Sequence, residues 1–283
     1  MRWQDRRKSS NVEDRRGRGG KGLTVGGGLG AVLALVLYLF FGGDSDKIQQ
    51  NIRSFQKDKP AAERALSARD KELGDFAAVV LADTEDVWHS LFNDSGRRYR
   101  EPNLVLFSTG TDSACGAAQS ATGPFYCPGD EKVYIDLDFF QELQRRLDAE
   151  GDFAMAYVLA HEVGHHVQNL LGIMEQRDRM RDRVSEVEYN RYTVKLELQA
   201  DFLAGVWAHH AQRMKNILEE GDMEEAINAA GAVGDDRIQK RTRGYVVPDS
   251  FTHGTSKQRT RWFLKGWKTG DIKQGNTFDT DEL

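Results

Sequence analysis

Cysteine is scarce in this sequence, since only Cys115 and Cys127 among its 283 residues carry a thiol. Two thiols with no further ligands near them exclude a zinc knuckle, which needs about four. Internal repeats are also absent, while hydrophobic residues make up 39% of the chain and suffice for a core. The segment between the cysteines is short, so we expect a disulfide in an oxidising compartment. Free buried thiols are the alternative.

Long apolar runs are equally rare, and the sequence has one without a charge, LTVGGGLGAVLALVLYLFF, at residues 23–41. As a helix it would be about 28 Å long, close to the hydrocarbon thickness of a bilayer. It predicts a transmembrane signal anchor. A cleaved signal peptide is the alternative, but the run ends in the bulky Leu39, Phe40 and Phe41, which are poor cleavage residues.

Charge is distributed unevenly about this run. Residues 1–22 hold eight Lys/Arg against three Asp/Glu, a net of +5, so with a total of −5 the remainder carries −10. A basic N-terminal arm predicts a cytoplasmic N-terminus, contact with membrane lipid and a body outside the cytoplasm. We therefore expect a single-pass protein of the cytoplasmic (inner) membrane, with no nucleic-acid partner.

The rest of the chain predicts an α+β body at residues 73–283, joined to the membrane by a polar linker at 42–72. Residues 175–188 are dense in mixed charge and predict a solvated helix face. Thr255 and Gln258 form a capping-box pattern before the last helix. The predicted helices span about 73–92, 152–171, 190–215, 222–240 and 256–267, and the predicted strands 103–108 and 131–137.

His161-Glu162-Val163-Gly164-His165 is an H-E-x-x-H sequence inside an apolar helical run. Residues four apart share one helical face, so both imidazoles can reach one zinc ion. Glu162 lies beside them and can take a proton from a metal-bound water. A chance match is the alternative, but two histidines and a glutamate in an apolar helix are costly to bury without a partner.

A third ligand is required, and the metzincin extension is excluded because Gln168 and Leu171 stand at its glycine and histidine positions. The second apolar helix, KLELQADFLAGVWA (195–208), offers Glu197 and Asp201 on one face. Glu197 could complete a His₂Glu site, and Asp201 could accept the other ring N–H of a ligand histidine. A surface acidic pair is the alternative, which the apolar neighbours disfavour.

These segments together resemble the bacterial putative neutral zinc metallopeptidase family. The resemblance is carried by HEVGHH, LELQADFLAG, GPFYCPGDEKVYID, DSFTHGTSKQR and the N-terminal SSNVEDRRG. It implies a zincin-type, gluzincin-like fold in which His161 and His165 bind zinc, Glu162 is the base and Glu197 the third ligand. Thermolysin-like enzymes have an asparagine just before the ligand glutamate. Here that residue is Leu196, so another residue must provide the hydrogen bond that orients one of the ligand histidines.

Hydrolysis also needs a hydrogen-bond donor for the developing oxyanion, and His253 and Tyr245 are candidates, each with a structural role as the alternative. His166, His209 and His210 are not expected to be ligands. Strand VYIDL (133–137) is the candidate edge strand for pairing with substrate.

The sequence thus predicts a membrane-anchored zinc peptidase acting on peptide or protein substrates. A catalytically silent zinc-stabilised scaffold is one alternative, although retention of Glu162 counts against it. A membrane-tethered binding protein that acts through its basic arm is the other.

Overall fold

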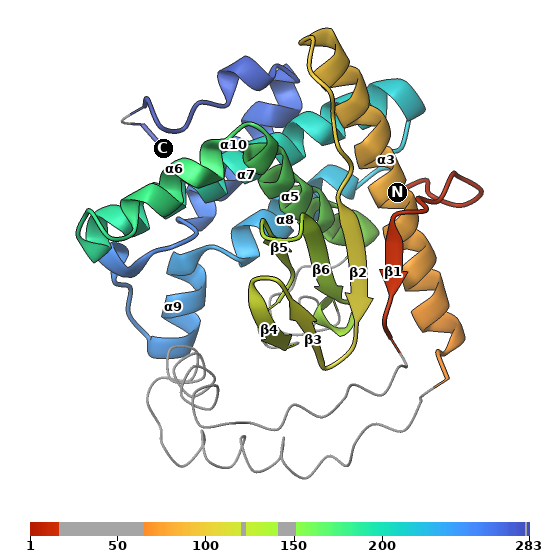
Figure 1. The fold of residues 1–283 in the computed structure, drawn as a ribbon, viewed down its shortest axis with the longest axis horizontal. Coiled ribbons are helices and arrows are strands. Elements are labelled where there is room, and N and C mark those ends of the chain that lie inside the picture. Colours follow the sequence, from red (N-terminus) through yellow and green to blue (C-terminus); the bar gives the residue numbers. More distant parts are fainter. Residues whose placement is uncertain (17–64, 120–122, 141–150, 281) are drawn as a thin grey trace.

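The computed structural model of the chain describes residues 1–16, 65–119, 123–140, 151–280 and 282–283, which form an α+β fold (Figure 1). Its main sheet has the order β1-β2-β6-β5. β1 (Val12–Asp14), β2 (Asn103–Phe107) and β6 (Lys132–Asp136) are parallel to one another. β5 (Phe125–Cys127) is antiparallel to β6. A separate hairpin joins β3 (Gly110–Ser113) to β4 (Gly116–Gln119).

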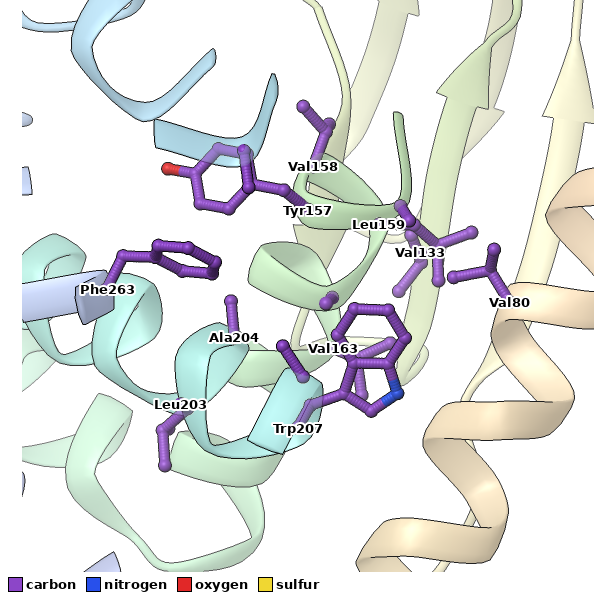
Figure 2. Close-up of a cluster of buried hydrophobic side chains, with 14 of the residues drawn as sticks. Val80, Val133, Tyr157, Val158, Leu159, Val163, Leu203, Ala204, Trp207 and Phe263 are labelled. Carbon is purple, nitrogen blue, oxygen red and sulfur yellow. The ribbon is translucent and has the colours of Figure 1, made fainter. Parts of the chain in front are cut away.

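The two faces of the sheet bury different sets of side chains, because successive residues of a strand point to opposite faces. Leu104, Leu106, Val133 and Ile135 join the main core, which they share with α3 (Ala68–Asp94) and α5 (Asp152–Leu170). Figure 2 shows Val133 between Val80 of α3 and Leu159 of α5. On the opposite face Val105, Phe107 and Tyr134 pack with Cys127 in a smaller core.

The hairpin is covalently tied to the sheet. Cys115 lies in the turn between β3 and β4 and forms a disulfide with Cys127 at the end of β5. The disulfide predicted from the sequence is therefore confirmed, and the prediction of free thiols is wrong.

Strand VYIDL was predicted to be an edge strand that binds substrate, and this prediction is wrong. β6 is hydrogen-bonded to β2 on one side and to β5 on the other, so both of its edges are occupied. Within the described residues the edges of the main sheet are β1 and β5.

The remaining helices pack beyond α5: α6 (Ile173–Met180), α7 (Glu186–Lys215), α8 (Asp222–Ala232), α9 (Asp235–Arg243) and α10 (Ser256–Thr269), with short 3₁₀ turns at η2 (Pro248–Ser250) and η3 (Ile272–Gln274). Glycines let α7 approach its neighbours closely. A Cβ on Gly205 would lie 2.1 Å from the Phe263 carbonyl oxygen of α10, and one on Gly164 of α5 would lie 3.0 Å from that of Ala200. Backbones at this separation bring side chains of α5 and α7 within reach of one ion.

The predicted helices are present, but α3 starts at Ala68 rather than at about 73 and α7 at Glu186 rather than at about 190, and two further differences concern their continuity. Residues 222–240 form two helices, α8 and α9, separated at Gly234, where a Cβ would lie 2.3 Å from the Ser256 nitrogen. The charged stretch 175–188 is also interrupted, because α6 ends at Met180 and α7 begins after a capping box at Ser185. The capping box predicted at Thr255 is present.

The N-terminal region differs most from its prediction. Residues 1–16, expected to belong to a free basic arm, are part of the folded body: β1 pairs with β2, and the Met1 side chain lies in the main core. The predicted linker also ends earlier, because α3 starts at Ala68. The transmembrane prediction at 23–41 and the rest of residues 17–64 lie outside the described residues. Among the helices described, none has the length and apolar character needed to span a bilayer.

Candidate metal centre

The residues predicted to bind metal meet where α5 crosses α7. His161 and His165 come from α5 and Glu197 from α7, and one ligand atom from each lies within 4.8 Å of the others. The Nε2 atom of His161 is 3.1 Å from Glu197 Oε2, and that of His165 is 3.4 Å from Glu197 Oε1. Both histidines are buried and Glu197 is nearly so. The Glu197 carboxylate thus lies close to the Nε2 atom of both rings.

The other nitrogen of each ring is held by a fixed acceptor. His161 Nδ1 is 2.8 Å from Asp201 Oδ1, as predicted for Asp201, and His165 Nδ1 is 2.8 Å from Gln168 Oε1. With Nδ1–H donated to these oxygens, the Nε2 atom of each ring faces Glu197 and can bind a metal ion once it carries no proton. Two neutral imidazole nitrogens and one carboxylate are a donor set that suits zinc. The residues present therefore fit the ion that the sequence predicted.

Gln168 was not predicted to take part in the site. It is fully buried, and its amide donates to the Leu196 carbonyl and to Gln199 Oε1. This glutamine occupies the role left open by Leu196, which replaces the asparagine of thermolysin-like enzymes. The sequence could have indicated this contact, because residues three apart on a helix lie close enough for their side chains to interact.

Arg259 of α10 was also missed. Its Nε lies 2.8 Å from Asp201 Oδ2 and its Nη2 lies 2.9 Å from Asp201 Oδ1, a two-point contact in which both residues are buried. The Tyr157 hydroxyl lies 2.5 Å from the same carboxylate. An arginine one turn before the apolar Phe263 could have been recognised as facing inward, but only the fold identifies its partner. Arg259 and Tyr157 together fix the carboxylate that orients His161.

The charges of these buried groups stabilise one another. Burial alone would raise the pKa of Asp201, but Arg259 and His161 outweigh it and lower that pKa to about 2. Burial opposes protonation of His161, yet Asp201 and Glu197 raise its pKa to about 10. Burial likewise works against a charged Glu197, while the two histidines hold its pKa well below the usual range. The site therefore strongly favours paired opposite charges.

Glu162 lies next to His161 on α5, and its side chain is buried. Within the part of the chain that the structure describes, no hydrogen bond or ion pair reaches its carboxylate. The residue is 8% exposed, and its carboxylate oxygens are not among the described polar atoms that are buried without a partner, so they can meet water or a ligand. This is the environment expected of a group that waits for a substrate or a water molecule.

His253 lies on the loop before α10, where Asp235 organises the backbone. Asp235 Oδ2 accepts the backbone N–H groups of Thr252, His253 and Gly254. Its other oxygen is 3.3 Å from His253 Nδ1, and the ring is half exposed to solvent. Burial disfavours the imidazolium, but Asp235 and the nearby Glu197 raise the pKa of His253. The His253 ring is thus within electrostatic reach of Glu197, whereas the role of Asp235 was not foreseen.

The other candidates lie apart from this cluster. Tyr245 follows α9 with 62% of its surface exposed, and its role stays a prediction. His166 is buried between the Tyr126 hydroxyl and the Arg100 carbonyl, and burial lowers its pKa. His209 and His210 contact backbone carbonyls after α10 or near its end. None of these three histidines belongs to the group of possible metal ligands among the described residues.

Comparisons with known proteins point the same way as the geometry. The chain is 46% identical over 284 residues to the uncharacterized protein YpfJ of Escherichia coli K12, covering 98% of this chain and 99% of that protein. It is 43% identical over 195 residues to the uncharacterized protein Rv2575 of Mycobacterium tuberculosis H37Rv, covering 65% of each. No solved structure matches significantly. The model of the family described as "Putative neutral zinc metallopeptidase" matches residues 1–278, and the chain belongs to that family.

Proposed function

We propose that this protein is a zinc-dependent peptidase of the gluzincin type, with His161, His165 and Glu197 as the metal ligands. The observation that carries the proposal is the convergence of these three side chains next to Glu162, whose carboxylate has no partner among the described residues. Zinc bound there would polarise a peptide carbonyl and lower the pKa of a water molecule. Membrane association through residues 23–41 remains part of the proposal, supported by the length of that uncharged run.

Glu162 is the proposed general base. It takes the proton of the attacking water and passes it to the amine that leaves when the peptide bond breaks, so the carboxylate is regenerated. The low exposure of Glu162 keeps bulk water from competing for this proton.

His253 is the proposed donor to the oxyanion that develops on the attacked carbonyl. Asp235 holds the loop through three backbone N–H groups and lies beside the ring nitrogen Nδ1, which leaves Nε2 available to the substrate. The negative charge of Glu197 contributes to the raised pKa of His253, which favours the protonated ring as a donor.

An extended substrate would pair with β5 rather than with β6. β5 is an edge strand within the described part of the sheet, and it contacts α5, the helix that carries the H-E-x-x-H residues. Exposed strand edges bind extended peptides through backbone hydrogen bonds. A peptide added along β5 would therefore run close to the metal ligands.

The decisive experiment compares Glu162→Gln with Glu197→Gln in the full chain, using a peptide library to find a cleaved substrate. Glu162→Gln should lower turnover by about 10²–10⁴ and leave zinc content unchanged. Glu197→Gln should lower both, because it removes a ligand. Glu175→Gln is the matched control, since Glu175 is 67% exposed and pairs only with Arg179 within its own helix.

Two results would contradict the proposal. If Glu162→Gln cleaves at the wild-type rate, Glu162 is not the base. If the wild-type chain binds zinc but cleaves no library peptide, the silent scaffold is the better description.

A further inference from the structure

The two ends of the undescribed segment 17–64 belong to one folded unit. The Leu104 nitrogen donates to the Asn11 carbonyl at 2.8 Å, and the Arg15 nitrogen to the Leu106 carbonyl at 2.8 Å, so β1 is bonded into the sheet at both ends. The Ser9 nitrogen also donates to the Ala78 carbonyl of α3 at 3.0 Å. Figure 1 shows β1 beside β2 and α3.

A buried carboxylate of α3 depends on this N-terminal segment. Glu85 is 2% exposed, and its oxygens receive hydrogen bonds from Arg7 at 2.9 Å, Ser9 at 2.5 Å and Asn11 at 3.0 Å. No other described residue is bonded to that carboxylate. Without residues 7–11 the carboxylate would be buried and unpaired, which is among the most costly arrangements in a protein.

The cations of residues 1–16 therefore have partners inside the fold. Besides the Arg7 contact with Glu85, Arg6 pairs with Asp83, a carboxylate of α3 that is 1% exposed. Lys8 pairs with Asp75 on the same helix. The positive charge that suggested a cytoplasmic, lipid-binding arm is used here to neutralise the acidic α3. It gives no independent support for an N-terminus on the far side of a membrane.

We propose that residues 1–16 and residues 65–283 lie on the same side of the membrane. Hydrogen bonds of 2.8 Å cannot join two strands across a hydrocarbon layer about 30 Å thick. The disulfide between Cys115 and Cys127 indicates that this shared side is the oxidising, extracytoplasmic one. The inference is independent of whether the metal centre hydrolyses peptides.

The first test is thiol accessibility in the full chain, expressed in bacteria and labelled in spheroplasts with a membrane-impermeant maleimide. Lys8→Cys reports on the N-terminal segment and Glu175→Cys on the body, and both side chains are at least half exposed. The parent chain gives the background, since its two cysteines are bonded to each other. Both variants should label before lysis. Labelling of one before lysis and of the other only after lysis would overturn the proposal, and labelling of both only after lysis would overturn the extracytoplasmic assignment.

A second test examines the docking itself. The Lys8 ammonium and the Asp75 carboxylate are 2.7 Å apart, so Lys8→Cys combined with Asp75→Cys should be cross-linked within one chain by a short bis-maleimide in membranes. Lys8→Cys combined with Glu175→Cys is the control pair. Cross-linking specific to the first pair supports the proposal. Equal, low yields in both pairs would show that residues 1–16 are not docked in the cell.

Discussion

Replacing Asp201 by asparagine is the most informative perturbation of this site. The side chain is fully buried and contacts His161, Tyr157 and Arg259, so asparagine preserves its shape while removing its charge. The guanidinium of Arg259, itself only 4% exposed, would then be left without a counter-charge. Breaking a buried ion pair from one side costs about 3–5 kcal/mol of unfolding free energy.

The pKa of Asp201 gives a second measure of the same interaction. Lowering it from 3.8 to about 2 corresponds to about 2 kcal/mol at neutral pH. Because the folded-state pKa is the lower one, this stability is present above about pH 4 and is lost as the pH falls toward 2. The Asp201→Asn variant should lack this acid-dependent term.

Zinc affinity should fall as well, because Asp201 orients His161. Loss of a residue that positions a metal ligand typically weakens binding 10–100-fold. Combining Asp201→Asn with Arg259→Met removes the orphaned cation, and we expect the double variant to regain stability while zinc affinity stays low. Urea unfolding and competition with a chromophoric chelator would measure the two quantities separately.

The control is Asp249→Asn, whose carboxylate is 67% exposed and pairs with the exposed Arg191. It should change neither quantity appreciably, as is usual for surface pairs. The assignment of Asp201 and Arg259 as positioning residues is refuted if the free energy of unfolding of Asp201→Asn is within about 1 kcal/mol of the wild-type value and its zinc affinity is unchanged.

Four further outcomes are expected. Gly205→Ala should destabilise the fold by about 3 kcal/mol in urea unfolding, because its Cβ would lie 2.1 Å from a backbone oxygen of α10. Gly231→Ala should instead leave the free energy of unfolding unchanged or raise it by up to about 1 kcal/mol, since its Cβ would make an ordinary contact of 3.6 Å. If both glycine variants lost the same free energy of unfolding, the close packing at Gly205 would be contradicted. Gln168→Leu should raise the zinc dissociation constant 10–100-fold, and unchanged binding in a chelator titration would remove its role in orienting a ligand. Reducing the Cys115–Cys127 disulfide should lower the unfolding free energy by about 3 kcal/mol, and identical urea midpoints with and without reductant would count against it.

The sequence alone determined the candidate metal ligands and the helices that carry them. His161 and His165 are four residues apart, and so are Glu197 and Asp201, and this spacing places each pair on one face of a helix whatever the tertiary fold. Local patterns of this kind also predicted β2 and β6. Their short range is the reason they could be recognised without a structure.

Features that depend on contacts between residues far apart in the sequence could be recognised only in the tertiary structure. Alternating apolar residues identified β6 as a strand, but its internal position follows from β2 and β5, which pair with it on opposite sides. Arg259 is 58 residues from Asp201, and no local pattern links the two. The same holds for Asp235, the first residue of α9, and His253, which lies 18 residues later on the loop before α10.

The N-terminal segment shows the difference most clearly. Its composition determined an excess of positive charge, and charge alone is compatible with lipid, with solvent or with carboxylates of the same chain. Only the fold decided among these, because it buries Asp83 and Glu85 of α3 where Arg6 and Arg7 can reach them. A buried carboxylate must be paired, and that requirement arises from tertiary burial rather than from the sequence of either segment.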